Sequence, residues 1–269
     1  MKKLRIKLVV VLLAMVILPT MARSDKPVRL RVLSYNIHHG EGIDRKLDLE
    51  RIANVILSVK PDLVALQEVD RKTSRTKNID QPAELARLTN MNVAFGANIE
   101  FQGRDYGNAV LSRFPIANFQ NHRLPNVDSG EQRGVLVAEI TIRKGDVPLR
   151  LLATHFDHRS ADKERVQSAR MVNALVEKDD RPSLLLGDLN DVLLSDTLNQ
   201  LKTKWSQTND KPLPTIPVAD PTRQIDFILF RPVDHWKILE VRVLKEAVAS
   251  DHRAIFSVLE YVPRKDPDE

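Results

Sequence analysis

Alternating and helical patterns of hydrophobic residues divide most of the chain into strands and helices. Residues 28–32 alternate apolar and basic side chains, the period of two that predicts a strand with one buried face, and the strand continues to residue 36. Apolar residues at helical spacing over residues 49–59 predict a helix that Pro61 ends. Further strands are predicted at residues 62–69, 92–97, 107–114, 133–142, 149–156, 183–188, 224–230, 238–244 and 253–260, and further helices at residues 82–88 and 161–176.

Strands and helices are mixed along the chain, and several predicted strands follow one another directly. This order favours a layered α/β architecture over a simple doubly wound parallel sheet. With no internal repeat or low-complexity linker, we expect a single domain over residues 23–263, followed by a flexible tail at residues 264–269. The proline-rich segment 211–221 is predicted to be a long surface loop near the functional site.

The N-terminal residues 1–22 have the pattern of a secretory signal peptide. Four basic residues precede an apolar run over residues 8–18, and Thr20 and Ala22 are the small residues expected before a cleavage site. The alternative is an uncleaved membrane anchor, but this run of 11 residues is shorter than the roughly 20 that span a bilayer. We therefore expect a periplasmic or secreted protein, without stable membrane insertion once the signal is cleaved.

Composition narrows the classes of function. The 269 residues carry a formal charge of +5, but removing the four basic residues of the predicted signal leaves +1 for the mature chain. The overall charge therefore does not indicate a nucleic-acid-binding surface. Hydrophobic residues make up 42% of the chain, enough for a packed core, and there is no cysteine. A bound metal would need oxygen or imidazole ligands.

The stretch LLLGDLND, residues 184–191, passes from a buried strand to polar groups. Alternation along an extended strand predicts that Asp188 and Asn190 share one face, whereas Leu189 faces the core. Gly187 would allow backbone and substrate to approach closely. Asp191 falls on the wrong face for a site and is expected to serve the following turn.

Other strand edges also carry carboxylate, amide or imidazole groups. Two of them, Asn36 and Glu68, close apolar strands, and Asp226 interrupts an apolar strand, where an unpaired charge would be costly. Each residue alone could mark a strand leaving the core. Together they predict one shared site, because ligands gather where strand ends meet. The set is Asn36, Glu68, His155, Asp188, Asn190, Asp226, Asp251 and His252.

These segments, in this order, resemble the endonuclease/exonuclease/phosphatase superfamily, which has the deoxyribonuclease-I-like fold. The resemblance covers residues 28–260 and is closest to secreted bacterial members regarded as metal-dependent hydrolases. It extends to the hydrolase-like domain of eukaryotic proteins that remodel glycosylphosphatidylinositol anchors. The matching segments are SYNI with Asn36, LQEV with Glu68, GNAVLSR with Asn108, THFDH with His155, GDLND with Asp188 and Asn190, IDFIL with Asp226, and SDH with Asp251 and His252.

The resemblance implies a four-layer α/β/β/α sandwich, with two mixed sheets packed face to face and one magnesium site at the strand ends. By this resemblance Glu68 would be the main metal carboxylate, supported by Asn36 and Asp251. Manganese or calcium could substitute, whereas zinc suits such an oxygen set poorly.

The catalytic roles implied by the resemblance involve five residues. Asp188 would deprotonate the attacking water, Asn190 would hold the water or a phosphate oxygen, and His155 would donate to phosphate oxygens. Asp226 would pair with His252, and such a carboxylate raises the pKa of its imidazole, so His252 would stay charged at neutral pH. The dication, the two imidazoles and an arginine would together neutralise the phosphoryl charge.

Asn108 and Arg133 are the expected substrate-binding residues. The alternative for Arg133 is an ordinary surface arginine, because its segment is a poor motif. Four neighbours of the motifs either shape substrate selection or are solvated loop residues: His38, His39, Asp157 and His158.

The leading functional hypothesis is an exported Mg²⁺-dependent phosphoesterase that hydrolyses a phosphodiester or phosphomonoester, acting as a monomer. A secreted endonuclease or exonuclease on DNA or RNA is the alternative within the same chemistry. Nucleic acid is less favoured because the mature charge is near neutral and aromatic residues make up only 5% of the chain. A noncatalytic binding module with this fold is the alternative of another class.

Overall fold

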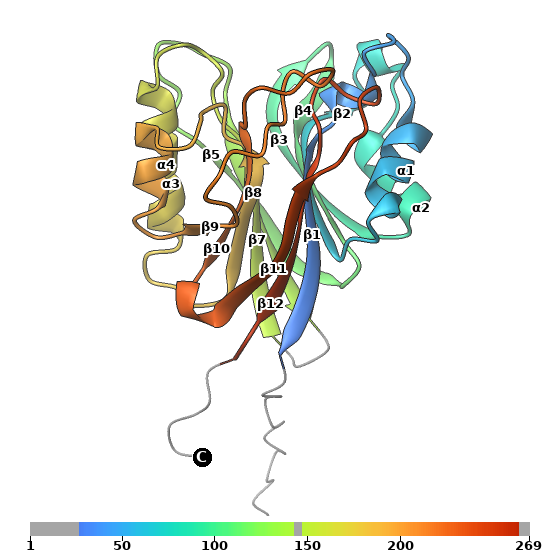
Figure 1. The fold of residues 1–269 in the computed structure, drawn as a ribbon. Helices are drawn as coiled ribbons and strands as arrows, with labels where there is room; N and C mark the ends of the chain where they lie inside the picture. The colour runs from blue at the N-terminus through green and yellow to red at the C-terminus, as the bar shows by residue number, and fades with distance from the viewer. Residues whose placement is uncertain (1–26, 143–146, 264–269) are drawn as a thin grey trace, which may run out of the picture.

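Two six-stranded β-sheets face each other and form the centre of the molecule (Figure 1). The computed structural model describes residues 27–142 and 147–263, so the predicted signal peptide and tail lie outside the described residues. The first sheet has the strand order β11-β12-β1-β2-β4-β3. Its strands are β1 (Val28–Asn36), β2 (Leu63–Arg71), β3 (Asn92–Phe101), β4 (Arg104–Ser112), β11 (Trp236–Val243) and β12 (Ile255–Tyr261).

The second sheet has the strand order β5-β6-β7-β8-β10-β9. Both sheets are mixed, since β1 runs parallel to β2 and β7 parallel to β8, whereas the other neighbours are antiparallel. The strands are β5 (Ile116–Arg123), β6 (Gly134–Ile142), β7 (Val147–His155), β8 (Ser183–Asp188), β9 (Ser206–Gln207) and β10 (Asp226–Arg231).

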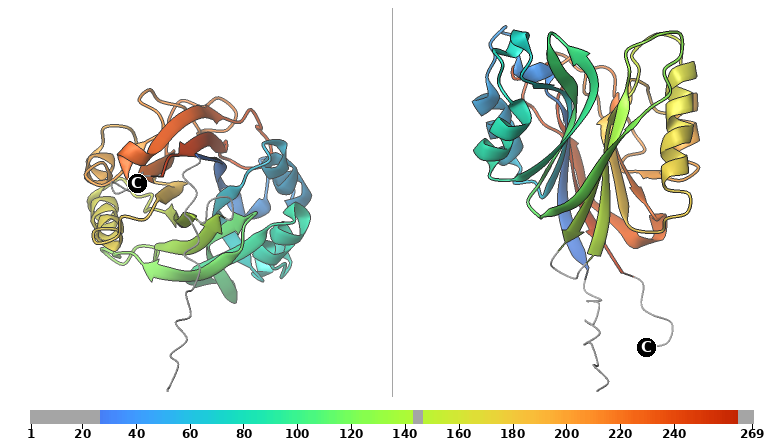
Figure 2. Two further views of the ribbon diagram at one scale, coloured as in Figure 1. Left: turned by 90° about the horizontal axis from the view of Figure 1, so that it is seen from below. Right: turned by 180° about the vertical axis from the view of Figure 1, so that it is seen from behind.

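Helices cover the outer face of each sheet and complete four layers (Figure 2). Helices α1 (Leu49–Ser58) and α2 (Gln81–Thr89) lie on the first sheet, and α3 (Lys163–Leu175) and α4 (Asp196–Leu201) on the second. Three apolar clusters fill the spaces between these layers, one between the sheets and one beneath each helix pair. The predicted α/β/β/α sandwich is therefore confirmed. Among the described residues, no helix has the length and hydrophobicity needed to cross a bilayer.

Two strands and one α-helix lack the patterns that predict them. Strand β5 lies at a sheet edge, where most of its side chains are exposed and little alternation of apolar residues is needed. Strand β9 has two residues, and α4 has six, too few for a helical period to stand out. The predicted loop over residues 211–221 packs beside the segment that carries the predicted residues Asp251 and His252. Arg253, the next residue, donates to the carbonyls of Thr215 and Val218.

Strand direction brings the predicted functional residues to one end of the sandwich. Asn36, His155 and Asp188 are the last residues of β1, β7 and β8, whereas Asp226 is the first residue of the antiparallel β10. In the registers, Asp188 is opposite both His155 and Asp226. This end lies away from residues 27 and 263, where the described chain begins and ends (Figure 1).

Candidate active site

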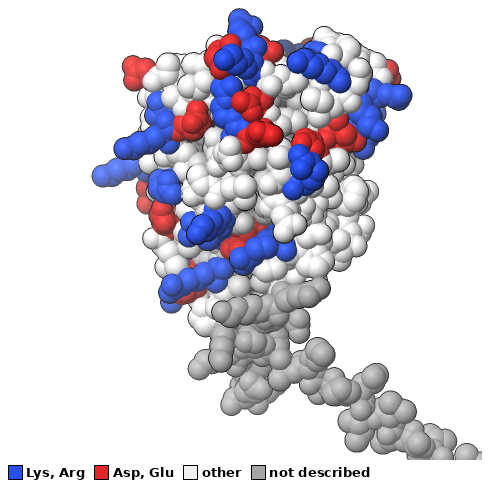
Figure 3. Space-filling model, turned by 90° about the vertical axis from the view of Figure 1, so that its right-hand side faces the viewer, with Lys and Arg blue, Asp and Glu red and all other residues white. Residues whose placement is uncertain are grey.

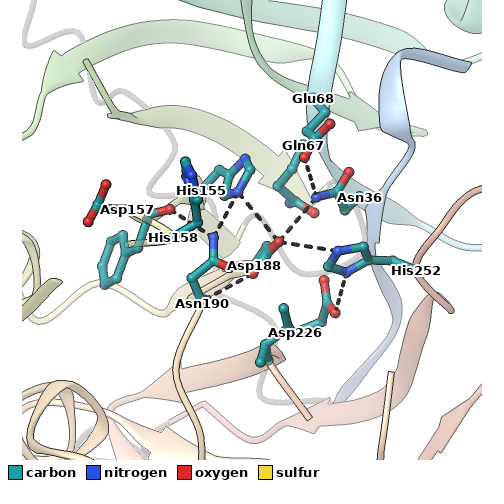
Figure 4. Close-up of polar contacts among 12 residues, drawn as sticks. Asn36, Gln67, Glu68, His155, Asp157, His158, Asp188, Asn190, Asp226 and His252 are labelled. Atoms are coloured by element: carbon teal, nitrogen blue, oxygen red, sulfur yellow. Dashed lines mark hydrogen bonds and ion pairs between the residues drawn. The ribbon is translucent and has the colours of Figure 1, made fainter. Parts of the chain in front are cut away.

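The carboxylate of Asp188 lies at the centre of a buried polar cluster (Figure 4). Its Oδ2 atom accepts a hydrogen bond from Asn36 Nδ2 at 3.1 Å and lies 3.4 Å from His155 Nε2 and 3.7 Å from His252 Nε2. Burial, reinforced by the nearby charge of Asp226, raises the pKa of Asp188 to about 7, although His252 and the Asn36 and Asn190 hydrogen bonds oppose the shift. A carboxylate with such a pKa can accept a proton near neutral pH.

Asn36 connects Asp188 to the second carboxylate of the cluster. Its Nδ2 atom also donates to Glu68 Oε1 at 3.0 Å, and its Oδ1 accepts from the backbone amide of His38 at 3.1 Å. The expectation that Glu68 closes its strand is wrong, because β2 continues to Arg71. Instead, the pairing of β2 with β4 shifts register between Leu66 and Val69, and Glu68 has a φ of 58° there. This bulge places the carboxylate at the site.

The predicted pair of Asp226 and His252 is present, with His252 Nδ1 2.9 Å from Asp226 Oδ2. Burial would lower the pKa of His252, but the charges of Asp226 and Asp188 outweigh it and raise the pKa to about 10. The imidazole is therefore protonated at neutral pH. Ser250 links the backbone at His252 to the end of β1. Its hydroxyl donates to the Asn36 carbonyl at 2.7 Å and accepts from the His252 amide at 3.2 Å.

Both ring nitrogens of His155 have close polar neighbours. Arg133 Nη1 lies 3.1 Å from Nδ1, and because arginine can only donate, Nε2 carries the proton of the neutral ring. Nε2 lies 3.0 Å from Asn190 Nδ2 and 3.4 Å from Asp188 Oδ2. Burial, with further contributions from Arg133 and His252, lowers the pKa of His155 well below its usual value. The imidazole of His155 is thus neutral, and the positive charges of this cluster come from His252 and Arg133.

Arg133 is neither a surface arginine nor directed freely into solvent. It is 3% exposed, and its Nη2 atom lies 3.1 Å from His158 Nδ1. Its Nη1 atom, which faces His155, also lies 2.9 Å from Glu131 Oε1. The guanidinium therefore holds two imidazoles in place. The sequence alone did not indicate this bridge, because no local motif links position 133 to positions 155 and 158.

The exit from β8 differs from the predicted alternation. The strand ends at Asp188, and Asn190 has a φ of 49°, so the two side chains do not share the face of an extended strand. They meet because the turn folds back: the Asn190 amide donates to Asp188 Oδ1 at 2.9 Å, and Asn190 Nδ2 also donates to the carbonyl of Phe156 at 3.0 Å. Asp191 lies outside the cluster, as predicted, with its Oδ2 3.1 Å from Arg165 Nε.

Gly187 serves the packing of two backbones. A Cβ atom at this position would lie 2.2 Å from the Thr154 carbonyl oxygen on β7. The neighbour that requires the glycine is therefore a strand rather than a substrate.

Hydrogen-bonding groups other than the Asp188 carboxylate lie beside Asn108 and Asp251. Asn108 Nδ2 donates to the Gly134 carbonyl at 3.0 Å and so joins β4 to β6 across the two sheets, whereas its Oδ1 is buried and without a partner among the described residues. Asp251 is half-buried and lies 3.3 Å from Ser250 Oγ through its Oδ1. Their predicted roles in substrate and metal binding stay predictions.

The donor set at Asn36 and Glu68 fits a hard divalent cation. A half-buried carboxylate and an amide oxygen are the ligand types that magnesium prefers, and such an ion keeps several waters. Asn36 Oδ1 accepts one hydrogen bond from the His38 amide and keeps a second lone pair for an ion. A second cluster of potential ligand atoms comprises Asp188, Asp226 and His252, all buried. That cluster suits a cation less well, because His252 is held protonated by its two carboxylates.

A four-layer sandwich with acids, amides and imidazoles converging at one end defines a scaffold for metal-dependent hydrolysis. A family model described as the Endonuclease/Exonuclease/phosphatase family matches residues 33–252, and the chain belongs to this family. Its members are metal-dependent hydrolases that act on phosphoester bonds, and this chain is accordingly a hydrolase of that kind. The predicted family is confirmed.

Individual relatives agree with this membership. The chain is 28% identical to "Uncharacterized protein YbhP" of Escherichia coli strain K12 over 214 residues, which cover 74% of this chain and 83% of YbhP. An endonuclease/exonuclease/phosphatase from Beutenbergia cavernae is 25% identical with a TM-score of 0.71, covering 87% of this chain and 72% of that one. Mannosyl-6-phosphatase Bt3783 of Bacteroides thetaiotaomicron shares the fold, with 19% identity, a TM-score of 0.70, and coverage of 86% of this chain and 99% of that one.

Proposed function

We propose that the protein is an exported Mg²⁺-dependent phosphoesterase that hydrolyses a small phosphodiester or phosphomonoester, with nucleic acid as the less favoured substrate. The convergence of Asn36, His155 and His252 on one oxygen of Asp188 carries this proposal. That oxygen faces the neutral amide of Asn36, the neutral imidazole of His155 and the imidazolium of His252. The Asp188 carboxylate can therefore accept a proton from water, and the imidazolium beside it can stabilise negative charge on a phosphate.

In the proposed reaction, Asp188 accepts a proton from the attacking water as the water oxygen bonds to phosphorus and the P–O bond to the ester alcohol breaks. The alcohol leaves and takes up a proton from solvent, while His252 stabilises the charge that grows on the phosphoryl oxygens. Asp226 keeps His252 protonated and fixes its orientation through the 2.9 Å contact. Asn190 holds the water or a phosphate oxygen near Asp188, and His155, oriented by Arg133, donates to the phosphate from its neutral form. A magnesium ion held by Glu68 and Asn36, with Asp251 in support, would supply electrophilic stabilisation of the phosphoryl group.

Among the described residues, surface charge on one side of the molecule shows no long track of basic residues for nucleic acid (Figure 3). On the face that carries α1 and α2, acidic and basic side chains are interspersed (Figure 3). Several of them pair, as Arg51 does with Asp44 at 3.2 Å and Arg87 with Glu84 at 2.6 Å. Paired charges leave little net potential to attract a phosphate backbone. Bt3783, a mannosyl-6-phosphatase by name, is a precedent for a sugar phosphate on this fold.

A panel of three substrates tests the proposal: a chromogenic phosphodiester, a chromogenic phosphomonoester and plasmid DNA, each with and without Mg²⁺. We expect turnover of one small ester that chelation abolishes and Mg²⁺ restores. Glu68→Ala should lower this turnover by roughly 10²–10⁴-fold, and His122→Asn, a change on β5, should leave it unchanged. Cleavage of plasmid DNA alone would favour the nuclease, and no turnover of any substrate would favour a binding module.

Export is tested separately by the mass of the protein recovered from the cell envelope. Loss of residues 1–22 is expected, because the basic and apolar segments end in small residues suited to cleavage. An intact Met1 in the envelope fraction would instead indicate an N-terminal anchor.

A further inference from the structure

His38, His39 and Glu68 bring metal-ligating atoms together beside the proposed magnesium position. One nitrogen of each imidazole and one carboxylate oxygen of Glu68 all lie within 4.8 Å of one another. We propose that these three side chains form a second cation site, selective for a first-row transition metal that imidazole favours, such as Co²⁺, Ni²⁺ or Zn²⁺. We call this set of three side chains the imidazole site.

The orientation of His38 suits a metal ligand. Its Nδ1 atom lies 3.0 Å from the Glu41 carbonyl oxygen, which can only accept a hydrogen bond, so in the neutral ring Nδ1 carries the proton. The lone pair is then on Nε2. A backbone carbonyl that fixes one nitrogen while the other faces a metal is the usual arrangement around ligating histidines.

His39 has a buried ring nitrogen that the protein leaves unsatisfied. Among the described residues, its Nδ1 atom is buried and has no hydrogen-bond partner. Its backbone is nevertheless fixed, because the His39 carbonyl accepts from Gln81 Nε2 at 2.6 Å. A histidine with a purely structural role would be expected to have such a nitrogen paired. A bound cation would satisfy it.

All three ligands have left-handed backbone conformations. The φ angles are 45° at His38, 46° at His39 and 58° at Glu68, in two separate segments of the chain. Left-handed conformations of residues other than glycine are costly and concentrate at functional sites. Extended backbone would carry successive side chains to opposite sides, whereas here the two imidazoles lie together, with ring centroids 4.4 Å apart.

The imidazole site and the magnesium position differ in ligand chemistry but share Glu68. Asn36 and Glu68 offer oxygen atoms to a hard ion, whereas two imidazoles favour cobalt, zinc or other first-row metals. A carboxylate with two oxygens can serve neighbouring cations. The expectation that zinc suits the oxygen set poorly therefore does not extend to this site.

Metal binding to the full chain, freed of metal by chelation, tests the inference. Calorimetric titration with Mg²⁺ and then with Co²⁺ should give a separate Co²⁺ event, accompanied by visible absorption from Co²⁺ coordinated by imidazole. His38→Asn and His39→Asn remove the imidazoles, and asparagine tolerates left-handed backbone. Each variant should weaken Co²⁺ binding by about 10-fold or more, since loss of a supporting group alone costs about that much.

Mg²⁺ affinity should be unchanged in both variants, because Asn36 and Glu68 remain. Glu68→Gln should weaken the binding of both Mg²⁺ and Co²⁺. His122→Asn is the matched control and should bind Co²⁺ like the wild type. Wild-type Co²⁺ affinity and absorption in both His38→Asn and His39→Asn would overturn the proposal, as would a wild-type chain that does not bind Co²⁺. The readout is binding, so failure of the proposed phosphoesterase activity would leave this result interpretable.

Discussion

His252 Nδ1 lies 2.9 Å from Asp226 Oδ2, and this ion pair joins the two sheets of the sandwich. Asp226 begins β10 in the second sheet, whereas His252 precedes β12 in the first. Both side chains are buried, so the attraction between them is only weakly screened by solvent. The pair therefore stabilises the approach of the sheets and also sets the protonation state of a residue in the site.

Replacing Asp226 by asparagine should lower the pKa of His252 from about 10 toward its ordinary value of 6.5, because the charge is lost while an oxygen acceptor remains. The unfolding free energy should fall by about 2 kcal/mol at pH 7, as for a hydrogen bond to a charged group. NMR titration of the His252 ring and denaturant unfolding measure the two effects. An unchanged His252 midpoint would show that Asp226 does not control its charge.

The raised pKa of His252 also predicts the direction in which stability changes with pH. The folded-state pKa of His252 lies above the unfolded value of 6.5, so its stabilising contribution is complete below pH 6.5 and is lost as the pH rises through about 10. Wild-type stability should therefore decline on the alkaline side more than that of Asp226→Asn. Parallel declines in urea unfolding from pH 7 to pH 10 would contradict the assignment.

Activity should follow a bell-shaped pH profile. Asp188 must be deprotonated to accept a proton, so the rate should rise with pH through a midpoint at or below about 7, and with saturating Mg²⁺ the added positive charge lowers that midpoint. The rate should fall again near pH 10 as His252 loses its proton. Asp188→Asn should lower kcat by roughly 10²–10⁴-fold. Asp191→Asn, outside the cluster, should keep the wild-type profile.

Arg133 is expected to act as a positioning residue through His155 and His158. Lysine cannot reproduce its planar contacts to two imidazoles, so Arg133→Lys should lower kcat while leaving KM for a small ester within about twofold. The pKa of His155 should rise when the guanidinium is removed in Arg133→Gln, because a repelling charge is lost. NMR titration of His155 checks this shift. A large change in KM alone would instead indicate direct substrate binding.

Gly187→Ala should destabilise the protein, because the new Cβ would lie 2.2 Å from a backbone oxygen of β7 that cannot move independently. Overpacking of this kind costs about 1–3 kcal/mol. Thermal unfolding should show a lower Tm, accompanied by reduced kcat as Asp188 is displaced. Gly130→Ala is a suitable control, since the three atoms nearest to its Cβ belong to the end of the Arg159 side chain rather than to backbone. Equal Tm values for the two variants would contradict the packing argument.

Hydropathy patterns were sufficient for the main elements of the sandwich. Strands such as β1 and β8 bury regular apolar faces, and α1 presents an apolar stripe to the first sheet, so a local pattern records what each element packs against. An element that buries no apolar face has no such pattern and is not predicted, as at the largely exposed edge strand β5. The motifs also identified the residues that meet at the strand ends.

Tertiary structure decided how these residues meet. Local alternation could not give the turn that returns Asn190 to Asp188, the bulge at Glu68, or the contact of Arg133 with His155 and His158. Likewise, the shifted pKa values of Asp188 and His252 arise from burial and from charges on strands distant in sequence. The sequence by itself determined which side chains are available and which faces are buried, because both follow from short-range periodicity. Only the packing of two sheets determined distances and protonation states, because electrostatic interactions depend on separation in space.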